Sequence, residues 1–184
     1  MNKRLLKAAS LLLIGSALVG CGATKEKAAM AESGGGGMIH VGIKNANGES
    51  IGMAMLTEQA DGIHIKVEAS KLPPGKHGFH IHENGVCEGP DFKTAGDHLN
   101  PQGHQHGFLN VKGPHDGDLP NLEAGPDGIA KAEHVDNRIT LAKGKPNSLL
   151  KPGGTSIVIH AAADDYRTDP SGNSGARIAC GVIK

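Results

Sequence analysis

His77-Gly78-Phe79-His80-Ile81-His82-Glu83 is the most informative stretch of the sequence. Apolar Phe79 and Ile81 alternate with His80 and His82, which is the pattern of a β-strand. Because side chains two residues apart in a strand point to the same face, the imidazoles of His80 and His82 can reach one ion. The stretch therefore predicts a strand that ends in a pair of metal-binding histidines.

Short alternating runs of apolar residues recur on both sides of this strand and are separated by turn signals such as Asn47-Gly48 and Asp61-Gly62. The other predicted strands lie near 38–43, 53–56, 63–67, 129–133, 138–141, 156–160 and 177–183. Two long segments rich in glycine and polar residues, 83–126 and 161–176, interrupt the pattern, and connections of that length are usually functional. The sequence predicts an all-β, eight-stranded sandwich or barrel with two long functional loops.

Length and composition narrow the class of protein. The chain has 184 residues, which fits one domain plus appendages. Nineteen basic and nineteen acidic residues give a formal net charge of zero, so no overall field attracts nucleic acid, and we expect no nucleic-acid partner. Eleven histidines are the unusual feature, because ordinary folding does not require so many.

The N-terminus predicts export and lipid attachment. A basic start is followed by an apolar stretch too short to span a membrane comfortably, so residues 1–20 are interpreted as a signal peptide. Leu18-Val19-Gly20-Cys21 resembles the bacterial lipobox, in which the cysteine receives the lipid; the alternative is an ordinary signal with a chance cysteine. Residues 21–37 are then a lipid-anchored flexible tether and 38–184 the folded domain, outside the cytoplasm on the bacterial cell membrane.

Cysteine use agrees with export. Apart from Cys21, the chain has Cys87 and Cys180, an even pair in an oxidising compartment. We expect them to form one disulfide, and the alternative is two unpaired thiols.

Further metal-ligand residues follow the pair His80 and His82. They are His98, His106, His115, Asp118 and His160. Seven candidate ligands indicate two metals, and an imidazole that has lost both ring protons can bridge two ions. Several imidazoles in tetragonal geometry suit copper, whereas three histidines and one aspartate in a tetrahedron suit zinc.

Three segments carry a resemblance to a known family. The stretch 77–83, Ala95-Gly96-Asp97-His98-Leu99-Asn100-Pro101, and Arg177-Ile178-Ala179-Cys180-Gly181-Val182-Ile183 closely resemble the Cu/Zn superoxide dismutases, over essentially all of 38–184. The resemblance implies an antiparallel Greek-key arrangement of the eight strands. It also implies one copper and one zinc per chain, and it allows a homodimer as well as a monomer.

The same resemblance assigns residues to roles. It implies copper ligands His80, His82, His98 and His160, and zinc ligands His98, His106, His115 and Asp118, with His98 shared by the two metals. Arg177 then meets the anionic substrate, superoxide, and His98 and Arg177 are the catalytic residues. Asp164 is the carboxylate that orients one ligand of each metal, with Asp165 as its competitor. Cys87 and Cys180 match the family disulfide.

The implied reaction is dismutation of superoxide to dioxygen and hydrogen peroxide, with copper carrying the redox chemistry. In better-known members of the family, charged residues flank the channel through which the substrate enters, and the loop 161–176 does not clearly match them. Arg167 is a candidate for that positive charge, and the alternative is a solvated side chain. The remaining histidines, expected to be solvated or structural, are His40, His64, His77, His104 and His134. His104 competes with His106 as a zinc ligand.

Three other functions remain open at this stage. The first is an extracytoplasmic copper or zinc binding or delivery protein, and the second is a structural sandwich whose metal sites have lapsed. Both would need a broken site, and the chain lacks neither a copper ligand nor Arg177. A two-metal hydrolase is the third, but it would need open coordination positions and bridging carboxylates, which this histidine-rich set does not offer.

Overall fold

The computed structural model describes residues 37–184. The predicted signal peptide 1–20, the lipidation at Cys21 and the tether as far as residue 36 lie outside the described residues. The strands are β1 Ile39–Asn45, β2 Ser50–Gln59, β3 Gly62–Ala69, β4 Gly75–His82, β5 Asp118–Ala124, β6 Ala130–Asp136, β7 Thr155–His160 and β8 Arg177–Ile183. A three-residue 3-10 helix, Lys93–Ala95, completes the elements, and within 37–184 no helix is long and apolar enough to cross a membrane.

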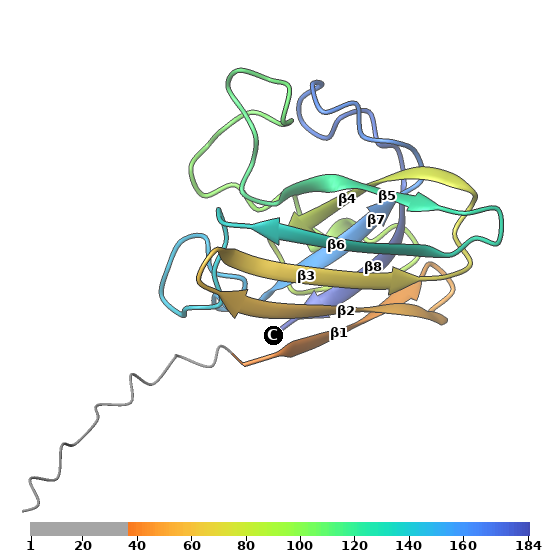
Figure 1. The fold of residues 1–184 in the computed structure, drawn as a ribbon, viewed down its shortest axis with the longest axis horizontal. Coiled ribbons are helices and arrows are strands. Elements are labelled where there is room, and N and C mark those ends of the chain that lie inside the picture. The colour runs from red at the N-terminus through yellow and green to blue at the C-terminus, as the bar shows by residue number, and fades with distance from the viewer. Residues whose placement is uncertain (1–36) are drawn as a thin grey trace, which may run out of the picture. The chain divides into compact units, whose positions relative to one another are not determined.

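The eight strands form one closed barrel in the order β1-β2-β3-β6-β5-β4-β7-β8, and every pair of neighbours is antiparallel (Figure 1). Two connections, β3 to β4 and β6 to β7, cross over instead of joining adjacent strands, as in a Greek key. The predicted all-β, eight-stranded antiparallel barrel is confirmed.

Alternation along the strands fills the barrel with aliphatic side chains. In β3, for example, Ile63, Ile65 and Val67 are buried while Lys66 and Glu68 between and after them are exposed. Strands β4 and β7 do not alternate in this way: the last six residues of β4 and all six residues of β7 are buried. These two strands pair with each other and are covered by loops at their ends, so polar side chains placed there are removed from water.

One predicted strand is wrong and one strand was missed. The segment 138–141 is irregular: Ile139 and Leu141 are buried, but the only ladder contact is an isolated bridge from Thr140 to Ser148. Strand β5 lies inside the segment 83–126, which was interpreted as loop throughout. Pro120 breaks the alternation in this strand. The proline is tolerated because it lies opposite an irregularity in the ladder with β4, between His77 and Phe79.

The two long loops come together against the outer side of the barrel, above β4, β5 and β7 in Figure 1. They run from Glu83 to Gly117 and from Ala161 to Ala176. Hydrogen bonds tie them to each other, from the amide of Leu109 to the carbonyl of Tyr166 at 2.9 Å and from the amide of His106 to the carboxylate of Asp169 at 2.7 Å. The outer side of the barrel beneath these loops therefore holds the histidines that the sequence predicted as metal ligands.

Candidate metal centre

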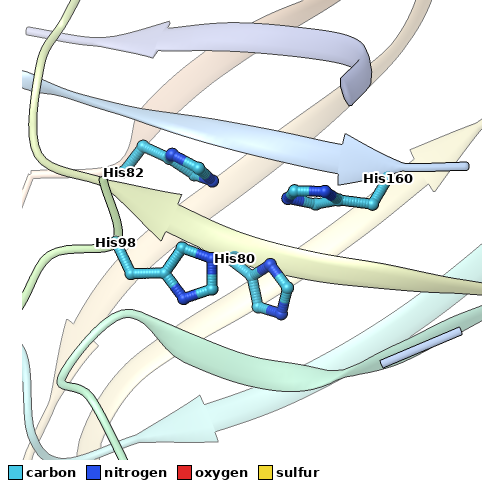
Figure 2. A group of neighbouring side chains, drawn as sticks. All are labelled: His80, His82, His98 and His160. Carbon is cyan, nitrogen blue, oxygen red and sulfur yellow. The ribbon is translucent and has the colours of Figure 1, made fainter. Parts of the chain in front are cut away.

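Four histidines converge between β4 and β7. His80 and His82 lie on β4, His160 ends β7, and His98 lies in the first long loop, where an isolated bridge pairs it with His82. Their imidazoles face one common space (Figure 2). One nitrogen of each lies within 4.8 Å of one nitrogen of every other, and none of the four residues is more than 6% exposed.

Each of these imidazoles has one nitrogen fixed and the other free. His82 and His160 use Nδ1 to donate to the carbonyls of Gly96 and Gly175, at 2.9 and 3.1 Å. His80 instead uses Nε2, which lies 2.9 Å from the Asp164 carboxylate. The remaining atoms are His80 Nδ1, His82 Nε2, His98 Nε2 and His160 Nε2, all buried without a hydrogen-bond partner. Four orphaned nitrogens in one buried space fit a bound metal ion, because buried polar groups otherwise find partners.

The protonation state of this cluster also suits a metal. Burial, reinforced by the charge of His98, lowers the pKa of His80 to about 3. Burial likewise lowers the pKa of His160 to about 4 and brings the pKa of His82 well below its ordinary value. The imidazoles are therefore neutral at physiological pH, and no proton has to be displaced from them before they bind a cation.

A second cluster surrounds Oδ1 of Asp118. That oxygen lies 2.8 Å from Nδ1 of His98, 3.0 Å from Nδ1 of His106 and 3.3 Å from Nδ1 of His115. Nδ1 of His115 lies 3.4 Å from Nδ1 of His98. Ligands held about 2.0 Å from a tetrahedral zinc ion are about 3.3 Å apart, so this set of three imidazoles and one carboxylate fits zinc.

The carboxylate of Asp118 is held in position and kept charged, as a metal ligand requires. Its Oδ2 accepts the backbone N–H groups of Gly107 and His115, at 2.9 and 3.0 Å, which leaves Oδ1 for the cluster. Although burial opposes its charge, hydrogen bonds with His106, His115 and His98 hold the pKa of Asp118 well below the usual range. The group remains an anion in the pH range in which zinc binds.

His98 belongs to both clusters, with Nε2 in the first and Nδ1 in the second. Asp164 provides a second link, since its Oδ2 faces His80 and its Oδ1 lies 2.9 Å from Nε2 of His106. Asp165 was the other candidate for this orienting role. It contacts no histidine and accepts hydrogen bonds from the backbone of Arg167 and Thr168. The structure thus brings together all seven predicted ligands and Asp164.

Comparison with known proteins agrees with this geometry. A family model described as copper/zinc superoxide dismutase (SODC) matches residues 50–183. The chain is also 51% identical over 146 residues to superoxide dismutase (Cu-Zn) 1 of Aquifex aeolicus strain VF5, covering 79% of this chain and 86% of the relative. The chain belongs to the Cu/Zn superoxide dismutase family.

Solved structures of relatives share the fold. The Cu/Zn superoxide dismutase from Brucella abortus is 34% identical with a TM-score of 0.65, and the match covers 80% of this chain and all of that one (100%). A SOD-like protein from Bacillus subtilis is 45% identical with a TM-score of 0.77, over 79% of this chain and 97% of that one. Copper and zinc are the metals this family implies, and the two clusters can hold them.

A pocket of about 610 Å³ opens onto the first cluster. His82, His98 and His160 reach it, together with Arg177 and Lys151. The Arg177 guanidinium donates to the carbonyls of Phe92 and Gly96, at 2.8 and 2.6 Å, and is therefore held at the pocket wall. Acidic Glu83, Asp97 and Asp169 also line the pocket, so the attraction for a small anionic substrate of a Cu/Zn superoxide dismutase depends on the local positions of Arg177 and Lys151 and not on the net charge of the lining.

Lys151 was missed by sequence reasoning. It lies in the connection between β6 and β7, which carries no motif, and only the folded chain shows that it lines the pocket. Arg167, the candidate for this charge in the loop 161–176, is exposed and is not part of the pocket lining.

Cys87 and Cys180 form a disulfide, as predicted, with their Cα atoms 5.7 Å apart. Cys180 lies on β8, three residues after Arg177, and Cys87 lies in the loop whose carbonyls hold the guanidinium. The disulfide of this Cu/Zn superoxide dismutase family member therefore joins the two segments that position Arg177.

The other histidines lie apart from both clusters. His77 is buried between the carbonyls of Pro73 and His160, and His104 lies on the surface beside the carbonyl of Pro114. His106, and not His104, faces Asp118.

Proposed function

We propose that this chain dismutates superoxide to dioxygen and hydrogen peroxide at a copper–zinc centre outside the cytoplasm. The observation that carries the proposal is the set of four buried, unpartnered ring nitrogens that converge beside a pocket lined by Arg177 and Lys151. Membership of the Cu/Zn superoxide dismutase family supports the same reaction.

The proposed ligand sets follow the atoms that the two clusters present. Copper takes His80, His82, His98 and His160, and zinc takes His98, His106, His115 and Asp118. When bound, copper supplies the one-electron exchange through its two oxidation states, and zinc, which has no redox chemistry, contributes charge and geometry.

The chain's own residues supply binding, orientation and protons. Arg177 attracts superoxide into the pocket and orients it, since its guanidinium is fixed by two carbonyls and charged at every physiological pH. Two superoxide anions and two protons yield one dioxygen and one hydrogen peroxide. Nε2 of His98 is the unpartnered nitrogen of the shared imidazole, and we assign it to carry one of these protons when it is not a copper ligand.

Location follows from the N-terminal sequence. Residues 1–20 act as a signal peptide, Cys21 carries the lipid, and residues 21–37 tether the domain 38–184 to the bacterial membrane. The Cys21→Ala variant, expressed in a bacterium, should move from the detergent-soluble membrane fraction to the aqueous fraction. Retention of this variant in the membrane fraction would contradict the anchor.

The decisive measurement is the catalysed loss of superoxide by the full chain. The protein is reconstituted with copper and zinc, and the control is the same protein with zinc alone. Rapid turnover that depends on copper is expected. Tight binding of both metals without turnover would contradict the proposal and favour the alternative, an extracytoplasmic protein that binds or delivers copper and zinc.

A further inference from the structure

Three methionines and one histidine gather on the outer surface of the barrel, on strands β1 and β2. Met38 precedes β1, His40 lies on β1, and Met53 and Met55 lie on β2. Met38 and Met53 are 56% and 49% exposed, although most large apolar side chains of the described residues are buried. We call these four residues the methionine face.

The register of β1 and β2 brings the four side chains to one side of the sheet. His40 is paired directly with Met55, and Met53 is paired with Gly42, so Met53 is the diagonal neighbour of His40. Met38 is two residues before His40 and points to the same side. Val41, Ala54 and Leu56, which alternate with them, point into the core. Rigid strand pairing, and not a loop, therefore fixes the arrangement.

One contact in the methionine face joins two metal-binding atoms. Nδ1 of His40 lies 3.3 Å from Sδ of Met53. A nitrogen about 2.0 Å and a sulfur about 2.3 Å from one ion are roughly 3.5 Å apart in tetrahedral coordination, so a small side-chain movement suffices for both to bind one ion. Thioether sulfur and imidazole together select monovalent copper, and they have little affinity for magnesium or calcium.

We propose that the methionine face binds one Cu(I) ion through the thioether of Met53 and the imidazole of His40, with Met55 or Met38 as a further sulfur ligand. The site is separate from the copper–zinc centre: in the barrel order three steps separate β1 from β4 and four separate β2 from β4. It does not depend on the proposed dismutase activity, since none of its residues lines the catalytic pocket.

Charge around the methionine face is balanced. On the neighbouring strand, Glu68 is paired with Met53 and Lys66 with Met55. Glu68 is also 2.9 Å from the amine of Lys131, and Lys66 is paired with Glu133 on β6, so two positive and two negative charges offset each other. Affinity must therefore come from the soft ligands and not from electrostatic attraction, and binding should depend little on ionic strength.

The test uses the full chain with copper and zinc already loaded and the copper reduced, so that both clusters are filled. One further equivalent of Cu(I) is added without oxygen, in competition with a Cu(I) chelator. X-ray absorption then reports whether the added copper has a sulfur neighbour. This signal excludes the copper–zinc centre, because none of its seven proposed ligands contains sulfur, and the substitutions below distinguish the methionine face from Cys21, Met1 and Met30.

We expect the wild type to retain the extra equivalent with a copper–sulfur distance near 2.3 Å. Met53→Leu, which keeps the apolar volume and removes the sulfur, and His40→Gln should each weaken retention at least about 10-fold and leave dismutase activity unchanged. His64→Gln is the matched control, since His64 is on β3 and contacts Asp61 and no thioether. Failure to retain the extra copper, a shell without sulfur, or equal retention by Met53→Leu would overturn the proposal.

Discussion

Oδ2 of Asp164 lies 2.9 Å from Nε2 of His80, and both side chains are wholly buried. The other oxygen of the same carboxylate faces His106, so one residue orients an imidazole of each cluster. Its own position is fixed by Asn121, which accepts the backbone N–H of Asp164 at 2.8 Å. The two metal sites are thus linked through a second residue besides His98.

Asp164→Asn should therefore weaken the binding of both copper and zinc. An amide is neutral, and it cannot accept from both ring N–H groups as the carboxylate does, so His80 and His106 lose their fixed orientation. We expect affinity for each metal to fall about 10- to 100-fold, measured by competition with chelators. Asp165→Asn is the neighbouring control and should leave both affinities unchanged; a fall in only one affinity for Asp164→Asn would contradict the bridging role.

Asp165 has a role in stability instead. Hydrogen bonds from Thr168, through its hydroxyl and its backbone N–H, and from the Arg167 backbone N–H lower the pKa of Asp165 to about 2. A carboxyl whose pKa is depressed on folding stabilises the folded state above its unfolded pKa, and this stability is lost as the pH falls through the folded value. Wild type should therefore melt at a higher temperature than Asp165→Asn at pH 7, and the difference should shrink between about pH 4 and pH 2. A difference independent of pH would contradict this origin.

The sequence predicted most of the site because its ligands are of unusual types in recognisable places. His80 and His82 share a strand face, ligand type added the five other candidates, and the family resemblance divided the seven between copper and zinc. Prediction from the sequence failed for Lys151, whose role depends on how distant segments meet, and for two segments whose local pattern of alternation was misleading. Strand β5 was missed because its first residue is the ligand Asp118 and Pro120 interrupts the alternation. The segment 138–141 alternates like a strand because Ile139 and Leu141 are core residues of a loop.

Lys151 is a pocket residue that the sequence did not predict, and the effect of its charge on catalysis can be tested. Because Lys151 lines the pocket and Arg167 does not, Lys151→Gln should lower kcat/KM for superoxide and reduce its dependence on salt. We expect a fall of about 2- to 10-fold at low ionic strength, at the lower end of what steering supplies. Arg167→Gln also removes one positive charge, but from outside the pocket lining, and should have little effect. Equal effects of the two substitutions would show that only net charge matters.

Arg177 should contribute through both its charge and its fixed position. Arg177→Gln removes the charge and should lower kcat/KM about 10- to 100-fold, with copper content unchanged. Arg177→Lys keeps the charge, but an ammonium cannot span the carbonyls of Phe92 and Gly96 as the planar guanidinium does. It should therefore recover only part of the loss and keep the salt dependence. Full recovery by lysine would mean that orientation has no role.

The disulfide between Cys87 and Cys180 should affect stability and activity together. The two cysteines are 93 residues apart, so the cross-link restricts the unfolded chain and contributes about 4 kcal/mol to the free energy of unfolding. Reduction of the metal-loaded protein should lower the midpoint of unfolding in denaturant accordingly. Because Cys87 holds the loop whose carbonyls fix Arg177, kcat/KM should fall under conditions in which the protein is still folded and retains copper. Reduced protein that remains folded, retains both metals and is fully active would show that the loop holds Arg177 without the disulfide.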